Sequence, residues 1–177
     1  QSQVKSTMGI YNKTITIDQQ MVTVEIPSET KDFDQYIHMS DYQTGKTLNL
    51  KDDGVYINAK LAEILDLKVG DQLTLSLDNK DYKVKIAGIY KLYFRHYIYM
   101  SPTYYKKTFK EDLKYNRILG VLNNPNVKME DSLSKKLFKI NSISGISFNT
   151  AAKETFRYTI KNLNYVVLVM ILSAGAL

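Results

Sequence analysis

The C-terminal stretch "NLNYVVLVMILSAGAL" constrains the fold more than any other part of this sequence. No charged residue follows Lys161, and from Tyr165 the residues are nearly all Val, Leu, Ile, Met, Ala and Gly. A helix of "YVVLVMIL" is apolar on every side and has no polar stripe to turn toward water. A single domain of 177 residues rarely encloses such a helix completely. The run is shorter than the about 20 apolar residues that cross a bilayer, but only because the chain stops. We therefore expect residues 150–177 to be a connecting helix and the start of a transmembrane helix, truncated at Leu177.

The residues around this run fit entry into a membrane. Tyr165 lies where an aromatic residue at the bilayer surface would lie, and residues 173–176 are small enough to let membrane helices approach closely. The preceding segment "NTAAKETFRYTIK" is polar and charged, so one helix would pass from water into lipid. The alternative is a buried C-terminal helix in the core of a soluble protein.

The first part of the chain predicts one hairpin. "TITIDQQMVTVEIP" is rich in β-branched residues and alternates around Asp18-Gln19-Gln20. Residues 1–12 are polar and weakly patterned, and we expect a frayed entry or the tail of a preceding helix there. Residues 1–34 are therefore predicted to be an N-terminal entry segment with the first hairpin. Gln1 is not an initiator methionine and no signal peptide is visible, so we expect a fragment of a longer protein.

The middle of the chain predicts a strand, a short helix and a second hairpin. "GVYIN" is a strand, with Asn58 placed to cap the helix "AKLAEILDL". In "DQLTLSLDNKDYKVKIAGIY", Leu73, Leu75 and Leu77 lie on one face of the first strand, and Val84 and Ile86 on one face of the second.

The later segments mix strands and helices without a βαβ rhythm. "YFRHYIYM" and "NRILGVL" are predicted strands, and "GISF" a last short one. "SPTYYKKTF" begins a helix with Ser101 as its cap and Pro102 in the first turn, and "KMEDSLSKKLFKI" is another helix. The predicted class is α+β, with a mixed or antiparallel sheet, several short helices and the long C-terminal helix. Residues 35–149 are the expected α+β core.

Positive charge is concentrated in one part of the chain. Residues 80–117 carry ten Lys/Arg against three Asp/Glu, although the net charge of the whole chain is only +6. The same part is rich in tyrosine. An exposed face of aromatic and basic residues binds anionic lipid, a peptide or a glycan, or single-stranded nucleic acid by base stacking. The candidate docking residues are Tyr93, Arg95, Tyr97, Tyr99, Tyr104, Tyr105, Lys106 and Lys107. The simpler interpretation is that the tyrosines pack in the sheet and the lysines face water; nothing resembles an RNA-binding signature.

Catalytic and metal-binding patterns were not found. The chain has no cysteine, and a pair such as His38 with Asp41 falls short of the three or four ligands that a metal site needs. His96 is predicted to be a packed, hydrogen-bonded strand residue. No nucleophilic serine motif, P-loop or dinucleotide-binding motif is present. We therefore expect a protein that is not an enzyme and binds no cofactor or metal.

The order of three blocks resembles the FtsX-like (MacB-type) family of ABC-transporter permeases, more narrowly the large permeases of low-GC Gram-positive bacteria. These blocks are "YIHMSDYQTGKTLNLKDDGVYINAKLAEILDLKVGDQLTL", "HYIYMSPTYY" and "TFRYTIKNLNYVVLVMILSAGAL". The similarity runs from about residue 35 to the end, and residues 1–34 are unmatched. The last block is the most specific of the three.

The resemblance implies an extracytoplasmic domain at the cell membrane. Such a domain would be non-catalytic and would couple ATP hydrolysis by a separate cytoplasmic subunit to export, extraction or signalling outside, a scheme called mechanotransmission. Its implied partners are the ATP-binding subunit, membrane lipid and a second such domain, with no nucleic acid. The residues implied to transmit the motion are those of the polar half of the terminal helix: Lys153, Phe156, Arg157 and Lys161.

Two other functions fit the residues. The helix-"VGD"-strand element also occurs in swapped-hairpin and double-psi-barrel regulators, which together with the basic stretch would make a cytosolic DNA-binding protein. Such regulators are much shorter and end in polar sequence, whereas this chain ends apolar. The third possibility is an extracellular sensor or a scaffold for a cell-wall enzyme.

Overall fold

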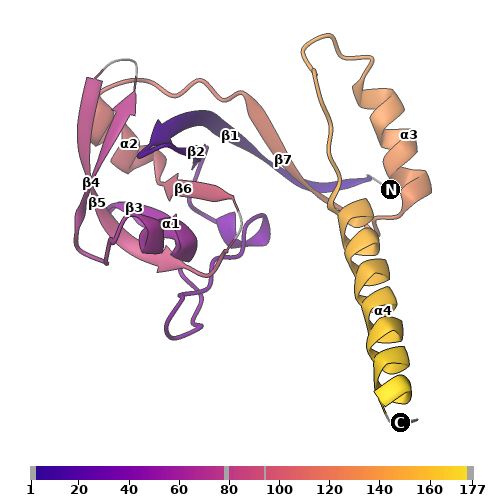
Figure 1. The fold of residues 1–177 in the computed structure, drawn as a ribbon. Helices are drawn as coiled ribbons and strands as arrows, with labels where there is room; N and C mark the ends of the chain where they lie inside the picture. The colour runs from indigo at the N-terminus through magenta and orange to yellow at the C-terminus, as the bar shows by residue number, and fades with distance from the viewer. Residues whose placement is uncertain (1–2, 78–79, 94, 175–177) are drawn as a thin grey trace. The chain divides into compact units, whose positions relative to one another are not determined.

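The computed structural model describes residues 3–77, 80–93 and 95–174 (Figure 1). The chain divides into two compact units. We call Val4–Val121 the sheet unit, and Gln1–Gln3 with Leu122–Leu177 the helical unit. The expected domain boundaries at residues 34 and 149 stay a prediction. The first hairpin pairs with a strand from the middle of the chain.

The sheet has seven strands in the order β4-β5-β3-β6-β2-β1-β7. It is mixed: β1/β2, β3/β6 and β4/β5 are antiparallel, whereas β2/β6 and β3/β5 are parallel. The predicted α+β class with a mixed sheet is confirmed. The strands are β1 (Val4–Ile17), β2 (Gln20–Pro27), β3 (Val55–Asn58), β4 (Gln72–Leu77), β5 (Lys80–Tyr90), β6 (His96–Met100) and β7 (Arg117–Leu122).

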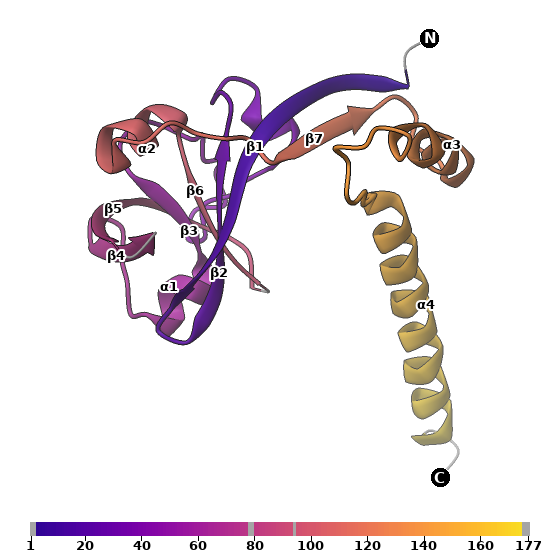
Figure 2. The same cartoon turned by 90° about the horizontal axis from the view of Figure 1, so that it is seen from above.

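The first hairpin forms as predicted, but the strand before it is longer than expected. Asp18 and Gln19 form the turn with φ of 44° and 64°, the positive values that a two-residue type I′ turn requires. Strand β1 begins at Val4, so the expectation of a frayed segment is wrong for residues 4–12. Its buried residues Met8 and Ile10 stand next to Thr7, Gly9 and Tyr11, and this weak alternation hid the strand. Figure 2 shows the length of β1.

The element from β3 to β5 contains a short helix, α1 (Ala59–Ile64), three residues shorter than predicted. The second hairpin has the predicted alternation: Leu73, Leu75 and Leu77 are buried on β4, and Val84 and Ile86 on β5. Its expected turn at residues 78–81 falls partly outside the described residues. The expected strand "YFRHYIYM" is reduced to β6, because residues 91–93 and 95 are loop.

Both faces of the sheet are covered. The sheet curls so that β1 also contacts β4. Inside the curl lies a largely aliphatic cluster that includes Val24, Ile57, Ile86 and Ile98, together with residues of α1 and of α2 (Pro102–Phe109). Ser101 caps α2 as predicted, since its hydroxyl accepts a hydrogen bond of 2.9 Å from the backbone N–H of Tyr104.

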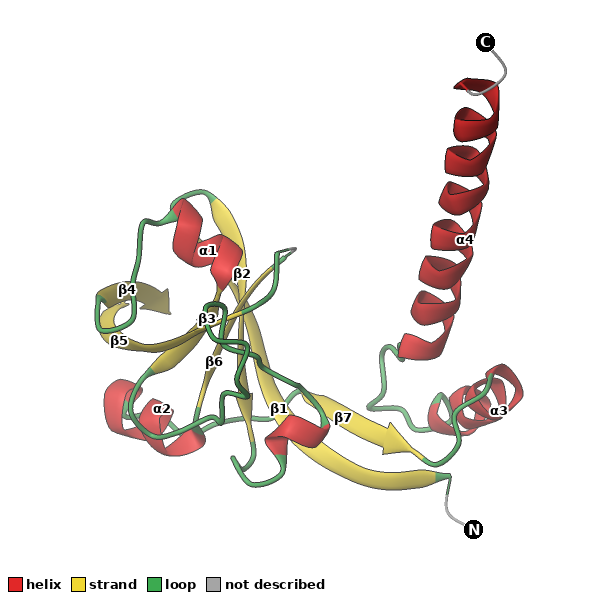
Figure 3. Cartoon of the chain, turned by 90° about the horizontal axis from the view of Figure 1, so that it is seen from below, coloured by secondary structure: helices red, strands yellow, loops and turns green. Residues whose placement is uncertain are grey.

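The opposite face carries a cluster of different composition. It contains three buried tyrosines and is covered by residues from the segment 28–54. That segment is mostly loop, with one 3₁₀ turn, η1 (Phe33–Gln35); Figure 3 shows the loops in green. We call this the tyrosine face and the other the aliphatic face. The fully packed members of the tyrosine face are Met8, Ile10, Phe33, Met39, Leu50, Tyr56, Tyr90 and Tyr99.

The helical unit contains α3 (Val127–Leu137) and α4 (Asn149–Ala174). Asn126 caps α3 by accepting a hydrogen bond of 3.0 Å from the N–H of Met129. The short strand expected at residues 145–148 is wrong, because these residues are loop. Among the described residues, no helix combines the length and the apolar character that crossing a membrane requires.

Candidate functional site: a polar latch on strand β7

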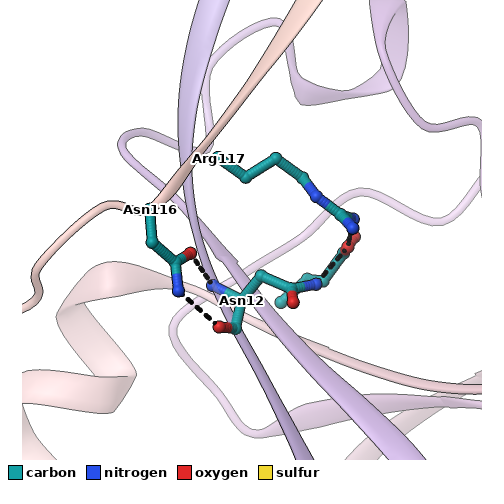
Figure 4. Close-up of polar contacts among 4 residues, drawn as sticks. Asn12, Asn116 and Arg117 are labelled. Atoms are coloured by element: carbon teal, nitrogen blue, oxygen red, sulfur yellow. Dashed lines mark hydrogen bonds and ion pairs between the residues drawn. The ribbon is translucent and has the colours of Figure 1, made fainter. Parts of the chain in front are cut away.

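Four polar side chains meet where β7 begins, on the last strand before the chain passes into the helical unit. They are Asn12 of β1, Glu25 of β2, Asn116 and Arg117 (Figure 4). We call these four residues the polar latch. All four belong to the sheet unit. They are brought together because β1 pairs with β2 on one side and with β7 on the other.

Asn116 binds the backbone of Asn12 with its side-chain amide. The backbone N–H of Asn12 donates to Oδ1 of Asn116 at 2.8 Å, and Nδ2 of Asn116 donates to the carbonyl of Asn12 at 2.7 Å. The backbone N–H of Asn116 also donates to the carbonyl of Ile10 at 3.1 Å. The side chain of Asn116 therefore supplies the pair of bonds that a neighbouring strand residue would supply.

Glu25 is the buried centre of the latch. Its side chain is only 3% exposed, whereas that of Arg117 is 49% exposed. The Oε1 atom of Glu25 accepts one hydrogen bond from the guanidinium of Arg117 at 2.5 Å and another from Nδ2 of Asn12 at 2.8 Å. A buried carboxylate without such partners would be strongly destabilising, so Arg117 and Asn12 allow Glu25 to occupy this position.

The surroundings of Glu25 have opposing effects on the pKa of its carboxyl group. Burial raises the pKa of the carboxyl, and the charge of Arg117 and the hydrogen bonds from Asn12 and Arg117 lower it, with the net pKa above the usual value. Glu25 lies directly across from Tyr99 in the β2/β6 pairing. Burial, followed by the charge of Glu25, raises the pKa of Tyr99 as well. The carboxylate therefore sits at the margin of the tyrosine face.

The latch is suited to holding a strand and not to catalysis. Glu25 is occupied by two donors, and neither Asn side chain can act as an acid or a base. No group of three or more His, Cys, Asp or Glu residues able to hold a metal occurs in the part of the chain that the structure describes. The chemical result is an attachment of β7 to β1 and β2 through charged and neutral hydrogen bonds.

Sequence reasoning did not identify the latch. The signal for Glu25 was visible, since it is the only charged residue in the strand "QMVTVEIP". Arg117 likewise opens the otherwise apolar strand "RILGVL". Pairing these two charges, 92 positions apart, required knowing that β7 lies next to β1.

The structure does not gather the eight candidate docking residues on one exposed face. Tyr99 and Tyr97 belong to the tyrosine face, where their rings stack with centroids 6.1 Å apart. Tyr105 is buried in the aliphatic cluster, and Tyr104 packs against that cluster. The candidates that remain exposed are Tyr93, Arg95, Lys106 and Lys107. Docking at these four residues stays a prediction.

A buried asparagine fixes the loop that carries two of them. Asn58, expected to cap α1, makes no side-chain capping bond. Its Nδ2 instead donates to the carbonyls of Leu92, at 2.9 Å, and Arg95, at 3.2 Å, and its Oδ1 accepts from the N–H of Tyr97 at 3.1 Å. Asn58 is fully buried, and Arg95 adopts a positive φ of 53°. The capping prediction is wrong because the loop takes both N–H donors of the side chain and a hydrogen bond to its Oδ1.

The four residues expected to transmit motion all lie on α4. Arg157 and Lys161 are exposed. Of Lys153 and Phe156 only the helical backbone is described, so any role of their side chains lies outside the described residues. His96 is packed as expected, but its Nδ1 is buried without a hydrogen-bond partner, so the predicted hydrogen bonding is not found at that atom.

Comparison with solved structures finds similar chains. No protein-family model matches the chain, and no curated protein sequence is similar to it. The periplasmic region of MacB from Actinobacillus actinomycetemcomitans superposes with a TM-score of 0.49 and 13% identity, covering 89% of this chain and 78% of that one.

Proposed function

We propose that this chain is a non-catalytic, extracytoplasmic domain of an ABC-transporter permease. It would couple ATP hydrolysis by a separate cytoplasmic subunit to work on the outer side of the cell membrane. The proposal takes its class of protein from the resemblance of three sequence blocks, in order, to the FtsX-like permeases.

One observation carries the proposal: the second half of α4 exposes apolar side chains. Arg157 and Lys161 are exposed on its first half. Beyond them, six of the large apolar residues whose burial the structure describes are each more than half exposed. An exposed apolar surface of this kind marks a site that lipid or protein covers. The six residues are Leu163, Tyr165, Val166, Val167, Met170 and Ile171.

The order of the elements along the chain supports coupling. Residues 123–148, which include α3, connect the end of β7 to the start of α4. A displacement of α4 would reach the sheet along the chain through these residues and then through β7. The polar latch holds the start of β7 to β1 and β2, so it would pass such a displacement into the sheet.

The location is tested by labelling an engineered thiol, because the chain has no cysteine of its own. In the protein as the cell makes it, Lys68→Cys places a thiol on an exposed turn between α1 and β4. A membrane-impermeant maleimide should label it in intact cells. Ala62→Cys is the matched control, since Ala62 is buried on α1 nearby and should react only after denaturation.

Labelling of Lys68→Cys only after lysis would contradict the extracytoplasmic location and favour the cytosolic DNA-binding alternative. Coupling needs a second test, because a sensor or scaffold outside the cell would give the same labelling. The detergent-extracted protein should copurify with an ATP-binding subunit and ATPase activity. Extracellular labelling without any associated ATPase would overturn the coupling function.

A further inference from the structure

We propose that β7 is a docking edge for a second copy of this chain, with the two β7 strands pairing antiparallel about Gly120. The inference rests on the exposed edge and the composition of β7, and it holds whether or not the chain belongs to a transporter. It begins from the position of β7 as the last strand of the sheet. An edge strand presents backbone N–H and C=O groups that can pair with another chain.

The two edges of the sheet differ in protection. At one edge, β4 contacts β1 as the sheet curls, and its outward residues are the polar Gln72, Thr74 and Ser76. At the other edge, β7 reads "RILGVL", without proline or lysine. Its one charged residue, Arg117, forms an ion pair with Glu25 and so does not block pairing at the edge. Proteins usually block free edges with the features that β7 lacks.

Strand β7 is also exposed and held in place. Ile118 is 72% exposed, nearly the highest value for a large apolar residue of the sheet unit. The open surface continues at Gly120, where an added Cβ would have no atom closer than the carbonyl oxygen of Ser6 at 4.0 Å. The polar latch fixes the beginning of the strand, so little further ordering is needed before another strand binds.

The sequence of β7 makes a second copy the fitting occupant. In an antiparallel pair centred on Gly120, Ile118 of one chain lies opposite Leu122 of the other, and Leu119 lies opposite Val121. Every apolar residue then meets an apolar residue, and Gly120 meets Gly120 without a clash of side chains. Opposed like charges, which destabilise strand pairs, do not occur in this register, since Arg117 lies opposite Asn123.

The same register keeps the faces of the two sheets continuous. Residues directly opposite each other in an antiparallel pair point to the same side, so Ile118 and Leu122 of both chains share one side. One strand pair is much smaller than the about 1,000 Å² that a stable interface buries. The association should therefore be weak and reversible, and a covalent trap is the appropriate way to detect it.

The test uses the whole chain in a mild detergent that covers α4. Gly120→Cys places a thiol at the centre of the proposed pair, where Cα atoms of opposing residues are close enough for a disulfide. Under mild oxidation it should give a disulfide-linked dimer. Met21→Cys is the control, because Met21 is 73% exposed, as Ile118 is, but lies beside the β1/β2 turn.

A matched pair of charge substitutions then tests the edge itself. In the Gly120→Cys background, Ile118→Lys should weaken dimer formation about tenfold, equivalent to about 1.4 kcal/mol, while Met21→Lys leaves it unchanged. Sedimentation of the cysteine-free chain and of its Ile118→Lys form gives the same comparison without a new thiol. Equal cross-linking of the two cysteine variants, no effect of Ile118→Lys, or an equal effect of Met21→Lys would each overturn the proposal.

Discussion

The two faces of the sheet are both buried, but by different kinds of side chain. The aliphatic face is closed by short helices and by the curl of the sheet, and its side chains need only fit. The tyrosine face is closed by a long loop segment, and its polar atoms must also find partners: the hydroxyl of Tyr56 donates to Asp53, that of Tyr90 to the carbonyl of Tyr97. The difference teaches that stability should depend on volume on one face and on hydrogen bonds and charge on the other.

The largest expected effect tests the aliphatic face. Ile57 is fully buried on β3, between β5 and β6, so Ile57→Ala removes apolar contacts and leaves a cavity. We expect the free energy of unfolding to fall by about 2–5 kcal/mol, measured by urea denaturation followed through tyrosine circular dichroism. Ile57→Val should cost about 0.5–1.5 kcal/mol. A loss for Ile57→Ala no larger than that of Ile57→Val would contradict a tightly packed aliphatic face.

A glycine on the tyrosine face gives the next effect, through crowding. A Cβ at Gly88 would lie 2.8 Å from a ring carbon of Tyr56. Gly88→Ala should therefore force the ring to move and cost about 1–3 kcal/mol in the same measurement. Gly120→Ala is the control, since the nearest atom to an added Cβ there is the carbonyl oxygen of Ser6 at 4.0 Å, an uncrowded distance. Equal stability of the two variants would show that the Tyr56 ring moves freely.

The polar latch predicts a pH-dependent effect of similar or smaller size. Arg117→Gln leaves the buried carboxylate of Glu25 without its cation, and should destabilise the sheet unit by about 1–3 kcal/mol near neutral pH. Burial already raises the pKa of Glu25, and losing Arg117 raises it further. Below the unfolded pKa, about 4.3, Glu25 is protonated in both proteins and the difference should shrink. It should grow as pH rises through the folded pKa.

Urea denaturation of both proteins at about pH 4 and about pH 8 measures this difference. The control is Arg117→Gln in a Glu25→Gln background, in which the pH dependence of the difference should vanish because no carboxylate remains. A penalty that is the same at both pH values in the Glu25 protein would mean that the ion pair contributes nothing and that only the packing of Arg117 matters.

The smallest effect on stability is expected outside both faces. Arg95→Ala with Lys106→Ala removes two exposed cations, of which Lys106 forms an exposed ion pair with Asp112 at 3.2 Å. The free energy of unfolding should change by about 0.5 kcal/mol or less. If the four exposed docking candidates bind anionic lipid, the unsubstituted protein should bind anionic vesicles in a salt-sensitive way, and the double variant should bind them less well. Binding that is equal for neutral vesicles would remove the electrostatic docking prediction.

Residues with a local pattern were predictable from the sequence, and residues with distant partners were not. The alternation of Leu73, Leu75 and Leu77 and the cap at Ser101 depend on neighbours within one element, and both are confirmed. Asn58 also occupies a capping position, but a loop more than 30 residues away uses its side chain instead. Glu25 and Arg117 are uninformative until the order of the strands is known. For this reason the polar latch could not be predicted from the sequence.

The bond that Asn116 makes to Asn12 turns one backbone amide into a natural reporter. The N–H of Asn12 points at a side chain rather than at a strand carbonyl. Its exchange with deuterated solvent therefore requires only that Asn116 withdraw, an event smaller than unfolding of the β1/β2 hairpin. If exchange at Asn12 becomes faster while its neighbours on β1 stay protected, β7 has been released from an otherwise intact sheet. This single amide therefore reports the release without any added label.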